Sequence, residues 1–429
     1  MPHTPRRLLT LAATVLLLPC ALYADEPADV VQRVLERVPL IDGHNDAPWS
    51  IRSRVKNRLT RFDFVDTTGL ERPMHTDLTR LRQGGVGGQF WSVWVPTDLD
   101  GPEAVQTVLE QVDLVHRLTD AYPNDLELAW SADDVRRIHG EGKIASLIGA
   151  EGGHSIGGSL AVLRSLAALG VRYMTLTHWQ SIPWADAATD TPSVGGLSPF
   201  GVEVVREMNR LGMLVDLSHV SAEAMHDALD ATRAPVIFSH SNARALNPHP
   251  RNVPDDVLRR LKDNGGVVMV NFGSFFVSAP FVERYAGSEA EEARLETLFP
   301  GDPDAREAGL DAWLEAHPMP RVTLADLADH IDHIRAVAGI DHVGIGSDYD
   351  GVGSVPEGLE DVSTYPVLLE ELARRGYSED DLAKVAGLNV LRVMEAAERV
   401  AAEMASELPP SDILLEDVDV VEHETASSE

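Results

Sequence analysis

Cysteine is nearly absent from this sequence, since Cys20 is the only one among 429 residues. An intramolecular disulfide is therefore excluded, and the fold must depend on its core and on any metal it binds. Hydrophobic residues make up 44% of the chain. A chain of this length can bury a sizeable core, as one large domain or as two to three smaller ones.

Basic residues are also scarce, with 36 Lys and Arg against 68 Asp and Glu, for a net charge of -32. This balance argues against nucleic acid as a partner, because phosphates require a basic surface. The end of the chain is especially acidic: residues 411–429 hold seven Asp or Glu and no Lys or Arg. We expect residues 406–429 to form an acidic, partly disordered tail.

Long apolar runs are missing except near the N-terminus, where residues 8–19 follow two arginines. Twelve residues are too few to span a bilayer. With the small Ala24 at the cleavage position, the pattern predicts a secretory signal peptide over residues 1–24. We therefore expect export to a periplasm or out of the cell, with no integral membrane span after cleavage. The alternatives are an uncleaved membrane anchor and a lipid anchor on Cys20.

Eight short runs rich in Val, Ile, Leu and aromatic residues recur along the chain, and each is a candidate buried strand. They lie near residues 38–42, 89–95, 144–150, 171–178, 213–219, 235–240, 267–272 and 342–348. Helical patterns lie between most of them; one begins at Ser198 and stops at Gly212. Such alternation over roughly 250–300 residues predicts a (β/α)8 TIM barrel with loop insertions.

The barrel is expected to occupy residues 25–405 as one domain. The polar, proline-rich segment from about 278 to 320 is expected to be an insertion beside the last strands. A doubly wound open sheet is the competing architecture, but no glycine-rich dinucleotide fingerprint follows the first run. The barrel is therefore the preferred prediction.

Imidazole and carboxylate side chains follow the ends of these runs. They are His44, Asp46, Glu151, His178, His219, His240 and Asp348. In a TIM barrel, the loops after the strands converge over one mouth. Residues far apart in the sequence are thus expected to share one site.

These side chains suit a pair of zinc ions, which one carboxylate can bridge at a separation of roughly 3.5–4 Å. His44 and Asp46 lie two apart on an extended strand, so both can reach one ion. His219 and His240, from neighbouring strands, can reach a second. Glu151 is the only carboxylate at the third or fourth strand end, and we predict that it bridges the two ions.

Several stretches longer than metal spacing requires run in order from about residue 38 to 400. They include DGHNDAPW, QFWSVWVP, EGGHSIGGSLAVLR, YMTLTHWQSIPWAD, DLSHVS, APVIFSHS, RNVPDDVL and GIGSDYDGV. In these stretches the chain resembles the membrane (renal) dipeptidase family of metal-dependent barrel hydrolases. The resemblance implies a dinuclear zinc dipeptidase in which a metal-bridging hydroxide attacks the peptide bond of a dipeptide. It also implies that two copies can associate as a homodimer.

The resemblance implies the same zinc ligands, with Glu151 between the ions. It further implies that His178 contacts the scissile carbonyl or the tetrahedral intermediate. Arg251, in PRNVPDD, would bind the substrate carboxylate, and Asp348 would handle the proton. Members of the family differ in whether they accept a D-residue at the C-terminal position, and the motifs leave this open.

Two features of animal members do not carry over. Those proteins commonly have disulfides and a C-terminal lipid anchor, whereas this chain has no cysteine after residue 24 and ends in a charged segment. One alternative function is a barrel metallohydrolase that acts on a β-lactam, a lactone or a phosphoester. A phosphoesterase should have more cationic groups near the metals than Arg251 supplies. A non-catalytic binding protein should lack a ligand or Asp348, and all of these residues are present.

Overall fold

The computed structural model describes residues 26–418. The predicted signal peptide at residues 1–24, with Cys20, and the last residues of the predicted tail lie outside this part. Among the described helices, none combines the length and the apolar character that a bilayer span requires.

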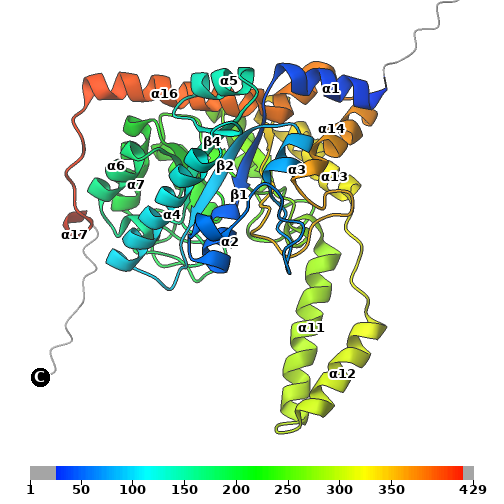
Figure 1. Ribbon diagram of the computed structural model, residues 1–429. Helices are drawn as coiled ribbons and strands as arrows, with labels where there is room; N and C mark the ends of the chain where they lie inside the picture. Colours follow the sequence, from blue (N-terminus) through cyan, green and yellow to red (C-terminus); the bar gives the residue numbers. More distant parts are fainter. Residues whose placement is uncertain (1–25, 419–429) are drawn as a thin grey trace, which may run out of the picture.

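Eight parallel strands form a closed barrel (Figure 1). They are β1 (Leu40–Asn45), β2 (Val86–Trp94), β4 (Ile144–Glu151), β5 (Val171–Thr175), β6 (Leu214–Asp216), β7 (Ile237–Phe238), β8 (Val267–Val270) and β9 (Val343–Ile345). Each strand pairs with the next, β2 pairs with β4, and β9 pairs with β1 to close the ring. The predicted (β/α)8 barrel is confirmed.

One further strand, β3 (Leu126–Leu128), was not predicted. It pairs with the first residues of β4, where Leu126 lies opposite Ile144. β5 pairs with later residues of β4, beginning with Ile148 opposite Val171. β3 is therefore an addition to the barrel and not one of its eight strands, and its three residues are too few to give a clear apolar run.

Helices surround the barrel and close one of its ends. They are α1 (Pro27–Arg37), α2 (Ala47–Val55), α3 (Leu78–Gln83), α4 (Gly101–Ala121), α5 (Ala132–Gly140), α6 (Leu160–Ala168), α7 (Pro199–Leu211), α8 (Ala222–Ala231), α9 (Asp255–Asn264), α10 (Ser274–Val277), α11 (Ala279–Leu298), α12 (Pro303–Ala316), α13 (Leu324–Val337), α14 (Tyr365–Arg374), α15 (Glu379–Ala383), α16 (Asn389–Glu407) and α17 (Leu415–Val418). Helix α7 begins and ends as predicted: Ser198 accepts a hydrogen bond from the Gly201 N–H, and Gly212 adopts a left-handed conformation with φ 70°.

Helix α16 covers the amino ends of the strands. Asn389 donates hydrogen bonds to the carbonyls of Ile340 and Val343, at the start of β9. Arg392 donates to the carbonyl of Gly265, just before β8. The carboxyl ends, where the predicted site residues follow the strands, therefore lie at the opposite mouth.

The insertion predicted at about 278–320 lies between β8 and β9, but it is helical. Helices α11 and α12 form a hairpin that projects away from the barrel (Figure 1). Two of its five prolines, Pro280 and Pro303, stand in the first turns of these helices. Ser278 caps α11 by accepting from the Phe281 N–H, and Asp302 caps α12 by accepting from the Ala305 N–H. Proline is well tolerated in a first helical turn, where its missing N–H is not needed.

The segment after α16 lies against the barrel as far as it is described. The Ser411 carbonyl accepts a hydrogen bond from Arg164, and Leu415 and Val418 pack against the main hydrophobic core. Within the predicted tail, Ser411, Leu415 and Val418 thus have defined contacts. The remainder of that tail lies outside the described residues.

Candidate metal centre

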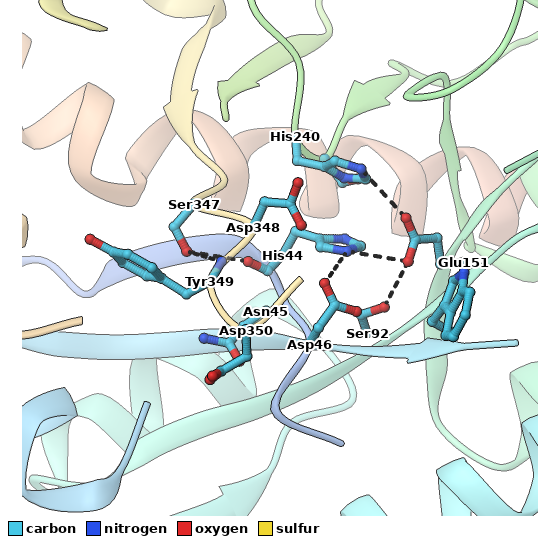
Figure 2. A network of polar contacts seen from close by, with 12 residues as sticks. His44, Asn45, Asp46, Ser92, Glu151, His240, Ser347, Asp348, Tyr349 and Asp350 are labelled. Atoms are coloured by element: carbon cyan, nitrogen blue, oxygen red, sulfur yellow. Dashed lines mark hydrogen bonds and ion pairs between the residues drawn. The ribbon is translucent and has the colours of Figure 1, made fainter. Parts of the chain in front are cut away.

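The predicted site residues are brought together at the carboxyl ends of the strands. Figure 2 shows His44, Asp46, His240 and Asp348 around the carboxylate of Glu151. His178 and His219 also approach this carboxylate, with Nε2 atoms 3.6 Å and 3.0 Å from its Oε1, and all seven side chains are buried. Because of the barrel topology, His44 and Asp348 are neighbours in one site although they lie 304 positions apart in the sequence.

The two carboxylate oxygens of Glu151 face two different sets of donors. Oε1 lies 3.0 Å from His219 Nε2 and 3.5 Å from His240 Nε2. Oε2 lies 3.4 Å from His44 Nε2, which in turn is 3.4 Å from Asp46 Oδ2. One carboxylate thus borders a bis-histidine set on one side and a histidine–aspartate set on the other.

The spacing of these donors fits a bound metal ion. The Nε2 atoms of His219 and His240 are 2.9 Å apart, and each is within 3.5 Å of Glu151 Oε1. A tetrahedral zinc ion with bonds of about 2.0–2.1 Å separates its ligand atoms by about 3.3 Å. The Nε2 atom of His44 is buried and forms no hydrogen bond within the described part of the chain. When it is unprotonated, its lone pair is available to a cation.

The far nitrogens of two of these imidazoles are held by hydroxyl groups. His44 Nδ1 lies 2.8 Å from the Tyr173 hydroxyl, and His240 Nδ1 lies 2.7 Å from Ser239 Oγ. Ser239 Oγ in turn donates to Asp216 Oδ2 at 2.6 Å. Such partners orient metal-binding imidazoles. The sequence analysis did not assign them a role, although Asp216 and Ser239 also follow or end apolar runs.

Two site residues have a left-handed backbone that side chains other than glycine rarely adopt. The φ angles are 71° at His219 and 64° at Asp348. Each such residue lowers the stability of the fold by about 1–3 kcal/mol, and it persists only where surrounding contacts hold it in place. The His219 carbonyl accepts from the Ala188 N–H, and the Asp348 N–H donates to the His44 carbonyl. Residues at a functional site are a common place for this strain.

Asp348 is further held by Asn271, which the sequence analysis did not single out. Asn271 follows β8, and its Nδ2 donates to Asp348 Oδ2 at 2.7 Å. This leaves Oδ1 of Asp348 available on the side of the other donors. Asn271 lies in the apolar run near residues 267–272, and a polar side chain close to the end of such a run was the signal that could have identified it.

Burial controls the charge of the histidines. It lowers the pKa of His219 and His240 well below the ordinary value, and that of His178 to about 4. These rings are therefore neutral near pH 7. Burial also lowers the pKa of His44, but the Tyr173 hydroxyl and the carboxylates of Glu151 and Asp46 outweigh it and raise that pKa well above its usual range. Without a cation, His44 holds a proton that a metal would displace.

The pKa values of Glu151 and Asp348 are shifted in opposite directions. Burial raises the pKa of Glu151, but the imidazoles of His44 and His178 outweigh it, so that pKa is well below its usual range. Burial raises the pKa of Asp348 well above its usual range, and the negative charges of Asp46 and Glu151 add to that effect. Glu151 is thus the permanent anion, and Asp348 is the group that can hold a proton.

Arg251 is a buried cation beside this site. Its side chain is 1% exposed, and its guanidinium lies 5.9 Å from the Trp179 ring and 5.3 Å from the Phe276 ring. A long contact of 3.5 Å joins it to Ser241 Oγ. Within residues 26–418 it forms no ion pair, and burial lowers its pKa to about 10. A buried guanidinium with no carboxylate at ion-pair distance is suited to bind an anion.

His178 completes the site. Its Nε2 lies 3.6 Å from Glu151 Oε1, and its Nδ1 accepts a hydrogen bond from Trp94 Nε1 at 3.2 Å. Among residues 26–418, three groups of side chains are close enough to hold an ion. They are His44, Glu151 and His240; Glu151, His178 and His219; and His44, Asp46 and Asp348. Geometry alone therefore allows His178 and Asp348 to be ligands as well.

Comparison with known proteins places this arrangement among peptidases. The model of the family described as membrane dipeptidase (peptidase family M19) matches residues 28–408. Dipeptidase 3 from Rattus norvegicus is 43% identical over 376 residues, which cover 86% of this chain and 67% of that protein.

Two solved structures share the fold. The probable dipeptidase PvdM from Pseudomonas aeruginosa is 29% identical with a TM-score of 0.75, covering 87% of this chain and 99% of that one. The dipeptidase AC, a metallopeptidase of family M19, is 25% identical with a TM-score of 0.69, covering 84% of this chain and 99% of that one.

Proposed function

The chain belongs to the membrane dipeptidase family, peptidase family M19, and from this premise we propose that it is an exported zinc-dependent dipeptidase. The observation that carries the proposal is the position of Glu151, whose two carboxylate oxygens face separate donor sets. This arrangement is suited to two ions that share one carboxylate.

In this proposal, His44 and Asp46 hold one zinc ion, His219 and His240 hold the other, and Glu151 contacts both. Neutral imidazoles and ionised carboxylates are the ligand forms that zinc requires, which agrees with the lowered pKa values of His219 and Glu151. Bound zinc would polarise the peptide carbonyl and lower the pKa of the attacking water.

Arg251 supplies the preference for a short peptide. Its buried guanidinium pairs with the free carboxylate of the substrate, and a charge-assisted pair in such a site is strong and directional. Because Arg251 and Glu151 belong to the same site, the carboxylate it binds must lie close to the scissile bond. A dipeptide satisfies this condition because its free carboxylate is one residue away from its single peptide bond.

Asp348 and His178 handle the proton and the developing negative charge. Asp348 Oδ1 takes the proton of the attacking water and later gives it to the leaving amine, while Asn271 holds Oδ2. His178 Nε2 donates a hydrogen bond to the carbonyl oxygen as it becomes negative. Both roles need a buried site that excludes bulk water, and both side chains are buried.

The remaining parts of the proposal concern the whole protein. Residues 1–24 act as a cleaved signal peptide, residues 25–405 form the dipeptidase domain, and the mature protein acts in a periplasm or outside the cell. Two copies associate as a homodimer, which sedimentation of the purified protein would test. The support for export is the arginine pair followed by a short apolar run.

A dipeptide panel tests the function. Purified mature protein is incubated with L,L and L,D dipeptides, their C-terminal amides, a β-lactam and a phosphodiester, with and without a chelator. We expect cleavage of dipeptides that a chelator abolishes and zinc restores, and L,D pairs report whether a C-terminal D-residue is accepted. Intact dipeptides with two zinc ions bound would reject the dipeptidase assignment, and cleavage of the β-lactam or phosphodiester alone would select the alternative hydrolase.

A further inference from the structure

The indole of Trp94 holds His178 from the side away from the metal ligands. Trp94 ends β2 and lies opposite Glu151, which ends β4. Its Nε1 donates to His178 Nδ1 at 3.2 Å, and the two rings meet edge to face with centroids 5.5 Å apart. Trp49 also packs against Trp94, at 4.5 Å with the rings perpendicular, but the hydrogen bond to His178 comes from Trp94 alone.

This contact determines which nitrogen of His178 carries its proton. An indole N–H can only donate, and a neutral imidazole has one donor and one acceptor nitrogen. Since Nδ1 of His178 accepts from Trp94, the proton of the neutral ring lies on Nε2. That atom is the one directed into the site, 3.6 Å from Glu151 Oε1.

Two of the other imidazoles, His44 and His240, have hydroxyl partners, whereas His219 Nδ1 is buried and forms no hydrogen bond within the described residues. Ser239 Oγ donates its own hydrogen to Asp216 Oδ2, so toward His240 Nδ1 it can only accept. The proton of His240 is therefore on Nδ1, and its Nε2 presents a lone pair toward Glu151. The Tyr173 hydroxyl can accept from His44 Nδ1 in the same way. The hydroxyl partners of His44 and His240 thus leave Nε2 with a lone pair for a metal, whereas the indole partner of His178 leaves Nε2 with a hydrogen to donate.

We propose that Trp94 is a positioning residue that keeps His178 out of the metal-ligand set and makes its Nε2–H a hydrogen-bond donor. Glu151, His178 and His219 lie close enough together to hold an ion. Distance alone therefore allows His178 to be either a metal ligand or a hydrogen-bond donor. A protonated Nε2 has no lone pair for a metal, and it can stabilise negative charge on an oxygen. The tautomer does not depend on the reaction, whereas the role toward a carbonyl oxygen rests on the proposed function.

The first test reads the tautomer directly by nitrogen NMR of protein labelled with 15N-histidine, metal-free and zinc-loaded, with His178→Gln to assign the signal. We expect His178 with Nδ1 unprotonated and Nε2 protonated in both forms. In Trp94→Phe, which keeps an aromatic ring but loses the N–H, we expect a mixture of both tautomers. A wild-type His178 that carries its proton on Nδ1, or whose Nε2 signal shifts as a ligand's does when zinc is added, would overturn the proposal.

The second test separates positioning from packing by kinetics. For Trp94→Phe we expect kcat to fall about tenfold with KM changed less than about twofold, since one hydrogen-bond donor to an oxyanion is typically worth 10²–10³ and His178 still samples the correct form. Trp49→Phe is the matched control, because it alters the same aromatic pair without touching His178, and it should retain kcat within about twofold. In a His178→Gln background, Trp94→Phe should have no further effect on kcat. An equal additional loss there would mean that Trp94 does not act through His178.

The two proposals fail differently. A wild-type protein that cleaves no dipeptide rejects the proposed function, and the NMR measurement still decides the tautomer. A dipeptidase with the opposite His178 tautomer rejects only the role of Trp94.

Discussion

The barrel mouth and the α11–α12 hairpin are built on opposite principles. At the mouth, eight charged or titratable side chains lie buried, and they come from the ends of six strands and from one loop. In the hairpin, α12 has no buried residue and α11 has Phe281 and Leu295. Buried charge and left-handed backbone at the mouth both lower the stability of the folded protein, and the surrounding structure must offset this. The hairpin has no such cost and is held by a few side chains of its own.

The contacts that hold the hairpin are made between its own two helices. Leu295 packs so closely on Gly309 that a side chain at position 309 would collide with it. Trp313 lies over Gly287, and the Arg284 guanidinium sits 4.5 Å from the Trp313 ring. A change at the mouth should therefore alter chemistry, and a change in the hairpin should alter only the hairpin. The following variants test this difference, from the largest expected effect to the smallest.

Glu151→Gln should have the largest effect. It removes the negative charge that both donor sets face, so we expect loss of zinc and a fall in kcat/KM on the order of a thousandfold. Elemental analysis and dipeptide kinetics check this. Glu207→Gln is the control, since Glu207 is equally buried but pairs with Arg164 and Arg210 away from the mouth. Full zinc content and activity in Glu151→Gln would remove the bridging role.

Asp348→Asn should separate chemistry from metal binding. The amide can still accept a hydrogen bond at this position but cannot take up a proton. We expect zinc near two per chain and turnover at least about a hundredfold lower. Because burial raises the pKa of Asp348, wild-type activity should fall on the acidic side as this carboxylate becomes protonated. Turnover within a few-fold of wild type would contradict the proton role.

Arg251→Met should affect only substrates that have a free carboxylate. Methionine keeps an apolar side chain between Trp179 and Phe276 but removes the cation. We expect kcat/KM for dipeptides to fall between about tenfold and a hundredfold, since a hydrogen bond to a charged group contributes about 1.5–3 kcal/mol. The C-terminal amides should change much less. Equal losses on both would show that Arg251 does not bind the carboxylate.

Shortening the hairpin should have the smallest effect. The ring of Trp313 lies over Gly287, so α11 and α12 are neighbours at this level and a short Gly/Ser linker can replace residues 288–314. We expect zinc content and kcat/KM within about twofold of wild type, because none of the site residues comes from this segment. A loss of tenfold or more, in a variant whose circular dichroism is otherwise preserved, would show that the hairpin contributes to the site.

The same contrast explains what the sequence could predict. The eight barrel strands could be found because parallel buried strands are continuous apolar runs, and the side chains after them meet at one mouth. The hairpin helices could not, because helices that bury so little carry no clear apolar stripe. Strand β3 was missed because it has only three residues.

Within the site, sequence spacing identified residue types but not the atoms that face one another. His44 and His240 were found, but not the hydroxyls of Tyr173 and Ser239 that orient them. The role of Trp94 depends on which nitrogen of His178 it contacts, and no spacing rule carries that information. Such partners become visible only when the strand ends are assembled in space.

Anomalous diffraction at the zinc absorption edge, from crystals grown with zinc, would test the central claim most directly. We predict two peaks about 3.5–4 Å apart on either side of the Glu151 carboxylate, one beside His44 and Asp46 and the other beside His219 and His240. A single peak, or two peaks that Glu151 does not separate, would contradict the assignment of this carboxylate as the shared ligand.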